Sequence, residues 1–347
     1  MRVYYELFNK IISLENLFSA WDEFKKDKRK KKDVLEFEWN LEENIFKLHE
    51  ELAAKTYRHS HYTSFYINDP KQRHIYKATV RDRVLHHAIF SVLNPIFEAA
   101  FIPDSFSCRI GKGTHKGIEV LNGMLRQVSG NGHKPCFALK CDIKKFFDTV
   151  NQGILLEIIC RKIKDQDAIL LIKEIIGSYK TSYSALFEWR GIPIGNLTSQ
   201  LFANLYLNEL DQFIKRDLKV KFYVRYTDDF VIVADNEVYL ENIILAIRKF
   251  LKDKLDLTLH PDKVSIRKFS QGVDFLGYVL RPHHLIIRTK TKKRIFKKLS
   301  LRINEYRNNK ITEESLEQSL QSYLGVLSHA DCHGLSEKLK NEFWLKA

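Results

Sequence analysis

Two adjacent aspartates, Asp228 and Asp229, lie between two apolar segments, residues 222–224 and 230–233. Such apolar segments predict short buried strands, where neighbouring carboxylates repel each other and lose their hydration. A cation bound beside the two carboxylates removes that cost. An Asp-rich surface turn is the alternative, although the usual turn residues Gly and Asn are missing here. The pattern therefore favours a strand–turn–strand hairpin that carries an acidic functional site.

A third carboxylate, Asp142, ends another apolar segment, residues 137–141. A strand that ends in aspartate beside a hairpin tip with two more would bring three carboxylates together, and such hard oxygen ligands suit Mg²⁺. Two such ions, about 3.5–4 Å apart, activate an attacking hydroxyl and stabilise a leaving pyrophosphate, and Mn²⁺ can substitute. The main-chain carbonyl of Ile143 can add a further oxygen. Asp148 is the competing carboxylate, but its place before a predicted helix favours a capping or supporting role.

Net charge limits the partners of this chain. Its 57 lysines and arginines exceed its 43 aspartates and glutamates, so the formal net charge is +14. Two basic segments, residues 25–32 and 288–310, predict a polyanionic partner, nucleic acid before membrane; a solvated lysine-rich surface is the alternative. No run approaches about 18 apolar residues, so no transmembrane helix is predicted. The five cysteines include no Cys-x-x-Cys pair, which predicts reduced thiols in a cytoplasmic protein.

Hydrophobic periodicity predicts a mixture of helices and strands. The expected helices cover residues 1–56, 82–93, 152–176, 238–255 and most of the chain from 288 onward. The expected strands lie in residues 57–77, with a turn at Asn68, Asp69 and Pro70, in 137–143, as two strands in 222–234 and as a strand pair in 273–287. Pro95 is expected to stop the helix over 82–93, because proline lacks the amide donor that a helix needs.

Taken in order along the chain, these motifs resemble those of reverse transcriptases. Tyr226, Thr227 and the two aspartates form Tyr-x-Asp-Asp, and Asp142 opens the pattern Asp-x-x-x-Phe-Phe. The resemblance implies that Asp142, Asp228 and Asp229 are the catalytic aspartates. Asp142 and Asp228 are then the main metal ligands, and Asp229 is weaker or supporting.

The resemblance also implies roles for side chains around the substrate. Arg73 and Arg81 match basic residues of the fingers that hold the triphosphate and the template. Phe147 matches the aromatic gate that excludes a ribose 2′-hydroxyl; simple packing beside Phe146 is the alternative. Lys263 matches a lysine that is a candidate general acid for the leaving pyrophosphate, with a solvent-exposed turn lysine as the alternative.

Residues 191–200 match the segment that lies under the incoming base and the template. Two pairs of residues in this segment differ from the usual reverse transcriptase motif, and these differences indicate a narrower group within the family. Ile194 and Gly195 stand where most reverse transcriptases carry Gln-Gly, and Ser199 and Gln200 stand where most carry Ser-Pro. This pattern is similar to that of reverse transcriptases from diversity-generating retroelements. Because isoleucine lacks the amide donor and acceptor of glutamine, we expect reduced discrimination against wrong base-pair geometry.

This narrower resemblance implies error-prone copying at template adenines and mutagenic retrohoming into a target gene. The implied partners are dNTPs, a structured template RNA, the RNA–DNA duplex and a small basic accessory protein that usually forms a pentamer; no membrane partner is expected. A bacterial or phage-encoded protein is implied. The alternatives are a group II intron-like, retron-like or defence-associated reverse transcriptase, and, in another class, a catalytically idle RNA-binding scaffold.

The fold class that follows is α+β, a right-hand polymerase whose palm is an antiparallel sheet carrying the Tyr-x-Asp-Asp hairpin. The expected regions are N-terminal helices and fingers in 1–100, palm in 101–149, fingers and palm helices in 150–190, palm again in 191–280, and a helical thumb in 281–347.

Overall fold

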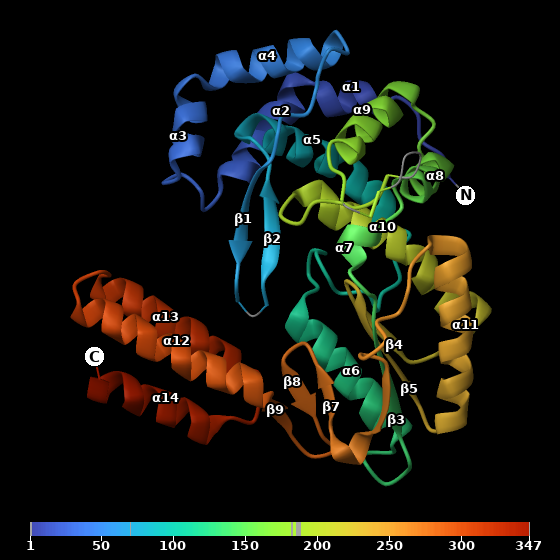
Figure 1. Cartoon of the computed structure of the whole chain (residues 1–347), viewed down its shortest axis with the longest axis vertical. Coiled ribbons are helices and arrows are strands. Elements are labelled where there is room, and N and C mark those ends of the chain that lie inside the picture. The colour runs from blue at the N-terminus through green and yellow to red at the C-terminus, as the bar shows by residue number, and fades with distance from the viewer. Residues whose placement is uncertain (1, 70, 182, 185–188, 347) are drawn as a thin grey trace. The chain divides into compact units, whose positions relative to one another are not determined.

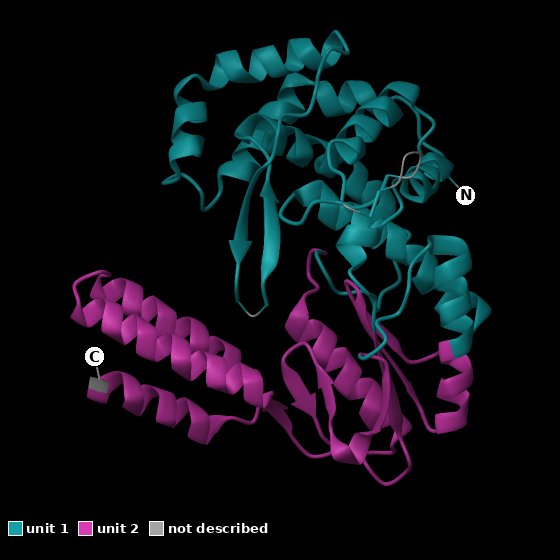
Figure 2. Ribbon diagram, in the orientation of Figure 1, with its two compact units in different colours: residues 1–108, 142–219, 245–262 teal, residues 109–141, 220–244, 263–347 magenta. Residues whose placement is uncertain are grey.

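Helices and antiparallel sheets alternate along the chain in the computed structural model, which describes residues 2–69, 71–181, 183–184 and 189–346 (Figure 1). They divide into two units (Figure 2). Unit 1 comprises residues 1–108, 142–219 and 245–262, and unit 2 comprises 109–141, 220–244 and 263–347. The α+β class is confirmed, because every strand pair whose register the structure defines is antiparallel.

The N-terminal part of unit 1 is helical, as predicted. It contains α1 (Phe8–Ile12), α2 (Leu14–Lys25), α3 (Lys32–Trp39), α4 (Leu41–Ala53) and α5 (Val80–Glu98). Helix α2 begins where the Ser13 side chain accepts a hydrogen bond from the Asn16 amide, and it packs on α5. Its side chains Leu17, Trp21 and Phe24 recur at helical spacing and are buried.

Helix α5 corrects the expected effect of Pro95, which lies inside the helix. Proline removes one hydrogen bond near the end of the helix but does not stop it. Leu93 and Phe97, on either side of the proline, are both buried. Burial of these two side chains offsets the lost bond, and the helix continues to Glu98.

The single helix expected over residues 152–176 is two helices, α8 (Gln152–Lys162) and α9 (Gln166–Gly177). Asp165 separates them, because its side chain accepts hydrogen bonds from the first amides of α9. Asn151, rather than Asp148, caps α8 by accepting hydrogen bonds from the amides of Gly153 and Ile154. Asp148 lies instead within the short helix α7 (Phe146–Thr149).

A two-stranded antiparallel hairpin projects from the helices of unit 1. Strand β1 (Thr63–Ile67) pairs with β2 (Arg73–Lys77), and Ile67 lies opposite Arg73. The predicted turn between the strands includes Pro70, which lies outside the described residues. Unit 1 also holds α10 (Leu197–Gln212) and the π-helical turn η1 (Phe213–Asp217).

A four-stranded sheet forms the centre of unit 2, with strand order β4-β5-β3-β6. The strands are β3 (Phe137–Asp142), β4 (Tyr223–Tyr226), β5 (Asp229–Ala234) and β6 (Ser265–Lys268). Helix α6 (Thr114–Val128) packs on β4 and β5. Helix α11 (Glu237–Leu255) follows β5, as predicted, and passes from unit 2 into unit 1.

Residues 273–287 form three strands, where the sequence predicted a pair. After the short helix η2 (Phe269–Gln271), strands β7 (Val273–Phe275), β8 (Tyr278–Leu280) and β9 (Leu285–Ile287) make a continuous antiparallel sheet. The extra turn lies at Leu276 and Gly277, whose φ angles are 48° and 92°. These left-handed conformations reverse the chain within two residues, which an apolar run such as this does not reveal.

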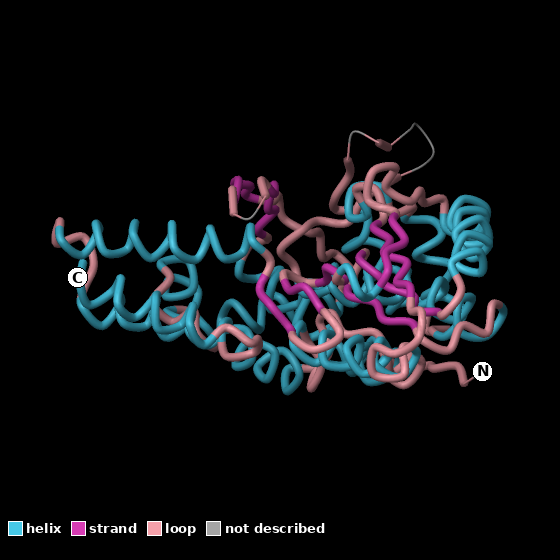
Figure 3. The backbone as a smooth tube through the Cα atoms, turned by 90° about the horizontal axis from the view of Figure 1, so that it is seen from below, coloured by secondary structure: helices cyan, strands magenta, loops and turns pink. Residues whose placement is uncertain are grey.

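The C-terminal helices of unit 2 are α12 (Thr289–Arg307), α13 (Glu313–Leu327) and α14 (His333–Lys346). They lie side by side in two perpendicular views (Figures 1 and 3). Helix α12 buries Ile295, Leu299 and Ile303, so its many lysines and arginines occupy the remaining faces. No helix in the described part of the chain is long and apolar enough to cross a membrane.

Candidate active site

The Tyr-x-Asp-Asp motif forms the tip of the predicted hairpin. Tyr226 ends β4 and pairs with Asp229, the first residue of β5. Thr227 and Asp228 make the turn, and Thr227 adopts a φ of 53°, which a β-branched residue rarely takes. The two aspartates are half-buried. The hairpin therefore brings both carboxylates to one end of β5, as the sequence predicted.

Arg225 supports this tip, and the sequence reasoning missed it. Its side chain is 0% exposed, and its Nη1 donates a 3.1 Å hydrogen bond to the main-chain oxygen of Thr227. A guanidinium in the apolar strand Tyr223–Tyr226 is costly unless its donors are used. We infer that Arg225 holds the strained turn in place. The signal in the sequence is a single arginine in a strand of otherwise apolar and aromatic residues.

Asp142 is the last residue of β3, as the apolar pattern predicted. It is 9% exposed, and its main-chain oxygen accepts a 2.7 Å hydrogen bond from the His260 amide. Ile143 is buried and forms an isolated antiparallel bridge with Leu259. In the four-stranded sheet β3 neighbours β5, so the strand that ends in Asp142 lies beside the strand that starts with Asp229.

The donors that the motifs supply are carboxylate and carbonyl oxygens, which are the ligands that Mg²⁺ prefers. No group of three or more His, Cys, Asp or Glu side chains that could hold a metal ion gathers among the described residues. Mg²⁺ is commonly bound by one or two carboxylates together with waters and substrate phosphates. The two carboxylates of the hairpin tip, Asp228 and Asp229, fit a site of that open kind.

The segment before α10 brings three sequence-predicted pocket residues together within unit 1. The Ile192 amide donates a 2.8 Å hydrogen bond to the oxygen of Phe147, and the Tyr76 amide donates a 3.0 Å bond to the oxygen of Ile194. Gly195 has a φ of +117°, and a Cβ there would lie 2.9 Å from a side-chain carbon of Ile75. Only glycine allows this close approach to β2.

The remaining pocket predictions are placed as follows. The Phe147 ring is half-buried and meets the buried Phe146 ring edge to face at 5.4 Å. Gln200 is exposed in the first turn of α10, and Arg73 is exposed at the start of β2. Lys263 lines a small cavity of unit 2, of about 200 Å³, together with Lys140, Arg267 and Asp274.

Arg81 is enclosed by hydrogen-bond acceptors. Its Nη1 donates to Glu51 at 2.7 Å, its Nε and Nη2 donate to Asp82 at 3.2 and 3.1 Å, and Nη2 also reaches the main-chain oxygen of Arg58 at 2.6 Å and Ser60 Oγ at 3.1 Å. In this conformation Arg81 ties α4, α5 and the segment before β1 together. The triphosphate contact that the sequence predicts for Arg81 would use the same guanidinium that forms these hydrogen bonds.

Asp82 is the buried centre of this network, and sequence reasoning did not single it out. Its side chain is 0% exposed, and it accepts hydrogen bonds from Tyr57 Oη at 2.8 Å, Thr79 Oγ1 at 2.7 Å and the Ser60 amide at 3.1 Å. Burial alone raises the pKa of Asp82, but hydrogen bonds from Thr79 and Tyr57 and the nearby positive charge of Arg81 outweigh burial and hold it below the usual value.

Two buried histidines continue the network to α10. His59 Nδ1 lies 2.6 Å from the Ser60 oxygen, so Nδ1 carries the proton and Nε2 is an acceptor. His86 Nε2 then donates to His59 Nε2 at 3.3 Å, and the Thr198 hydroxyl donates to His86 Nδ1 at 3.2 Å. Every ring nitrogen is satisfied with both rings neutral. Burial and the neighbouring His59 lower the pKa of His86 to about 3.

We expect acid to destabilise unit 1. The pKa of His86 is lower in the folded chain than in the unfolded chain, so the unfolded chain binds more protons at low pH. The stability that neutral His86 contributes is fully present above the unfolded-state pKa of about 6.5, and it is lost as pH falls toward the folded-state pKa of about 3. Between pH 7.5 and 5 the loss from His86 is about 2 kcal/mol. Urea unfolding at the two pH values measures it.

The matched variants are His86→Gln, which cannot titrate, and His61→Gln, which changes an exposed histidine. His86→Gln is expected to flatten the dependence of unfolding free energy on pH, and His61→Gln is expected to keep it. Equal pH slopes in the wild type and in His86→Gln would show that His86 does not carry the effect.

A sheet hairpin with paired aspartates at its tip, beside a strand that ends in another aspartate, is typical of the palm of a template-directed nucleic-acid polymerase. Residues 68–280 match the family model for reverse transcriptase (RNA-dependent DNA polymerase). The match covers more than half of the chain, and the chain therefore belongs to the reverse transcriptase family. The family that the motifs predicted is thus confirmed, and the roles of individual residues stay predictions.

Bacterial relatives are among the similar proteins. Protein YkfC of Escherichia coli is 27% identical over 236 aligned positions, and the match covers 58% of this chain and 61% of YkfC. The group II intron-encoded protein LtrA of Lactococcus lactis is 26% identical over 307 aligned positions, and the match covers 69% of this chain and 50% of LtrA. The chain thus spans between half and about three-fifths of the length of these two relatives.

Among solved structures, apo telomerase from Candida tropicalis aligns with a TM-score of 0.49 at 13% sequence identity. The alignment covers 72% of this chain and 53% of the telomerase chain.

Proposed function

We propose that this protein is an RNA-directed DNA polymerase that makes cDNA from a template RNA. The reaction is attack of a primer 3′-hydroxyl on the α-phosphate of a dNTP, with release of pyrophosphate. The observation that carries the proposal is the hairpin of Tyr226, Thr227, Asp228 and Asp229, which lies within the segment that matches the reverse transcriptase family. Loss of primer extension in an Asp228 variant, described in the Discussion, tests it.

In this proposal Asp142 and Asp228 are the main ligands of two Mg²⁺ ions, with Asp229 and the carbonyl of Ile143 in support. Once bound, such ions activate the primer hydroxyl and stabilise the leaving pyrophosphate. Arg225 keeps the hairpin tip in position through its bond to Thr227. We assign Lys263 as the general acid that protonates the pyrophosphate.

The substrate pocket is proposed to lie along β2 and the segment before α10. Phe147 would exclude a ribose 2′-hydroxyl, and Ile194 and Gly195 would lie under the incoming base pair. The hydrogen bonds that join Ile194 to Tyr76 and Phe147 to Ile192 support this assignment, because they hold these residues in one place. Arg73 and Gln200, both exposed, are proposed to contact the triphosphate and the template.

We further propose the subtype of a diversity-generating retroelement, which copies template adenines with frequent errors. Ile194 supports this reading, since its side chain offers no hydrogen bond at a position where most reverse transcriptases carry glutamine. The proposed partners are then a structured template RNA and a small basic accessory protein. The rival reading is a group II intron-like reverse transcriptase, which the similarity to LtrA favours. A repeat pair in the neighbouring DNA that differs mainly at adenines would select the first reading, and an intron ribozyme the second.

We expect Ile194→Gln to lower misincorporation opposite template adenine by about fivefold, because one restored hydrogen bond contributes about 1 kcal/mol of discrimination. Sequencing of cDNA made on a defined RNA template measures the error spectrum. Ile154→Gln is the matched control, since it makes the same change at a half-buried isoleucine of α8. An unchanged error rate opposite adenine in Ile194→Gln would show that Ile194 does not determine fidelity.

A further inference from the structure

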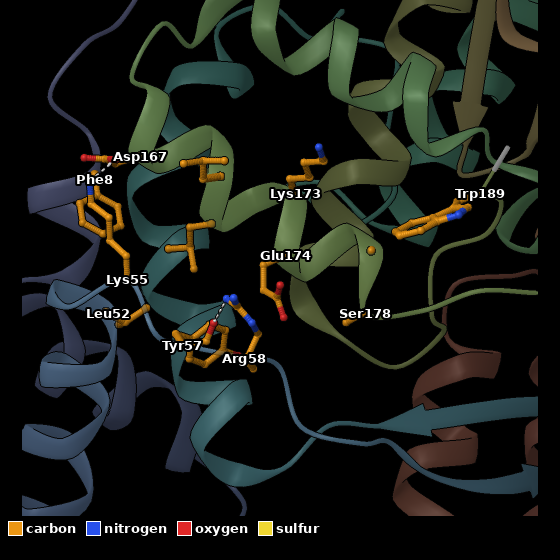
Figure 4. Close-up of a pocket in the computed structure, with 13 residues that line it drawn as sticks. Phe8, Leu52, Lys55, Tyr57, Arg58, Asp167, Lys173, Glu174, Ser178 and Trp189 are labelled. Atoms are coloured by element: carbon orange, nitrogen blue, oxygen red, sulfur yellow. Dashed lines mark hydrogen bonds and ion pairs between the residues drawn. The ribbon is translucent and has the colours of Figure 1, made fainter. Parts of the chain in front are cut away.

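A cavity of about 550 Å³ lies in unit 1 between α1, α4 and α9 (Figure 4). Phe8 and Trp189 lie at its opposite ends in this view, and Tyr57 and Arg58 lie along its lower side. None of the residues assigned above to catalysis or to the substrate pocket lines it. Cavities of roughly 300–1,000 Å³ are the size that holds small-molecule ligands and cofactors.

The deep part of this cavity is lined by buried apolar and aromatic side chains, and its edge is open to solvent. Leu52, Tyr57 and Leu171 line it and are buried. Leu170 is 58% exposed and Trp189 is 43% exposed, although both face the cavity. An exposed leucine and an exposed tryptophan in one concave surface are typical of a ligand site, because a bound apolar group removes both from water.

The charged residues of the lining leave an excess of positive charge. The carboxylate of Asp167 pairs with Lys55 at 2.6 Å, and Glu174 accepts a 3.1 Å hydrogen bond from the His59 amide. Among the residues that the structure describes, neither Arg58 nor Lys173 forms an ion pair, and both are exposed. Three cationic side chains of the lining, Lys55, Arg58 and Lys173, stand against the two carboxylates of Asp167 and Glu174, and the remaining positive charge favours an anion at the edge.

The walls are fixed by hydrogen bonds outside the cavity, so the site exists without a ligand. Tyr57 Oη donates to the buried Asp82 at 2.8 Å, and the main-chain oxygen of Arg58 accepts from Arg81 at 2.6 Å. Trp189 lies so close to Gly177 that a Cβ on this glycine would be 3.1 Å from the indole ring. A preformed cavity spares the ligand much of the cost of ordering its site.

We propose that this cavity is a second nucleotide site, in which a nucleobase enters the apolar depth and the phosphate lies between Arg58 and Lys173. A nucleotide joins a planar aromatic body to an anion, which matches an apolar, aromatic-lined cavity with cations at its edge. The nucleotide has two sources, a free nucleoside monophosphate or an unpaired nucleotide of a bound RNA. The proposal does not depend on the polymerase assignment, because it uses none of the proposed catalytic residues.

The test is binding of AMP to the full chain, measured by calorimetry without primer, dNTP or divalent metal. We expect saturable binding that Leu170→Glu and Lys173→Glu each weaken by at least about tenfold, since each puts a negative charge beside the phosphate or the base. Lys252→Glu makes the same charge change at an exposed lysine of α11 and is expected to bind as the wild type does. AMP binding that all three variants retain would place the nucleotide elsewhere and overturn the proposal.

A second experiment distinguishes a free nucleoside monophosphate from an unpaired nucleotide of a bound RNA. RNA hairpins that carry one 8-azidoadenosine, either unpaired or fully paired, are photocross-linked to the chain and the linked peptides are identified by mass spectrometry. Cross-links from the unpaired nucleotide to residues 52–58 or 167–178 support an RNA source, and competition by AMP for those cross-links supports a shared site. If AMP does not bind and neither hairpin labels these peptides, the cavity is not a nucleotide site, whatever the polymerase activity of the same preparation.

Discussion

Asp228→Asn is expected to reduce dNTP incorporation on a primed RNA template by about a thousandfold, which corresponds to roughly 4 kcal/mol of transition-state stabilisation. Asparagine keeps the size of the side chain and its place in the turn between β4 and β5. It removes the negative charge, and with it the attraction for a divalent cation. The fold should survive, because Asp228 is half-buried at a hairpin tip and not part of the core.

Primer extension with a labelled primer measures this effect, and circular dichroism of the variant checks that it is folded. Asp253→Asn is the matched control, since Asp253 is an exposed acid of α11 and loses the same charge. We expect the control to extend primers at the wild-type rate. A folded Asp228→Asn protein that incorporates dNTPs at the wild-type rate would show that the hairpin is not the catalytic site.

The largest expected effect on stability is that of Asp82→Ala, which should lower the free energy of unfolding of unit 1 by about 3–5 kcal/mol. The carboxylate is fully buried and accepts hydrogen bonds from Tyr57, Thr79 and Arg81. Removing it leaves the Tyr57 and Thr79 hydroxyl groups and the Ser60 amide without this acceptor. Arg81 keeps its 2.7 Å ion pair with Glu51, so the cost comes mainly from the buried donors that lose their acceptor.

Hydrogen exchange of the α5 amides in increasing urea measures this loss within unit 1, without assuming that both units unfold together. Asp22→Ala is the control. Asp22 forms a 2.8 Å surface ion pair with Lys25 and its side chain is 66% exposed, so its loss should cost less than about 1 kcal/mol. Equal effects of the two substitutions would mean that the buried network does not stabilise α5.

The part of the site that could be predicted from sequence is the part carried by neighbouring residues. Paired aspartates between two apolar runs leave few arrangements other than a hairpin tip, and β4 and β5 form that hairpin. Asp142 was predictable for the same reason, because it directly follows the apolar run of β3. In these cases burial of the flanking side chains decides the local structure, and the order of apolar and polar residues in the sequence predicts which side chains are buried.

Features that depend on a single turn or cap were predicted less well. Apolar residues recur on both sides of residues 163–165, so the sequence predicts one helix there. The structure shows that Asp165 caps a second helix, α9. The turn at Leu276 and Gly277 lies inside an apolar run and hides the third strand of the β7-β8-β9 sheet. A positive φ at leucine has no signature in composition or period.

Contacts between residues that are distant in sequence and lie outside the recognised motifs could not be predicted. Asp82 meets Tyr57 across 25 positions, and the cavity of unit 1 joins Leu52 to Trp189 without any shared motif. One sequence shows which residues can be buried, but it does not show which buried partners they meet. The structure supplies these pairings, and they underlie both the stability prediction for Asp82 and the second nucleotide site.

Primer extension with the purified protein, Mg²⁺ and a template RNA of defined sequence shows whether this chain is an RNA-directed DNA polymerase. We expect each dNTP to be added only opposite its complementary template base, and extension to stop when Mg²⁺ is removed by chelation. Folded protein that adds no nucleotide to any primed RNA, or that adds nucleotides without regard to the template, would show that the chain is not an RNA-directed DNA polymerase.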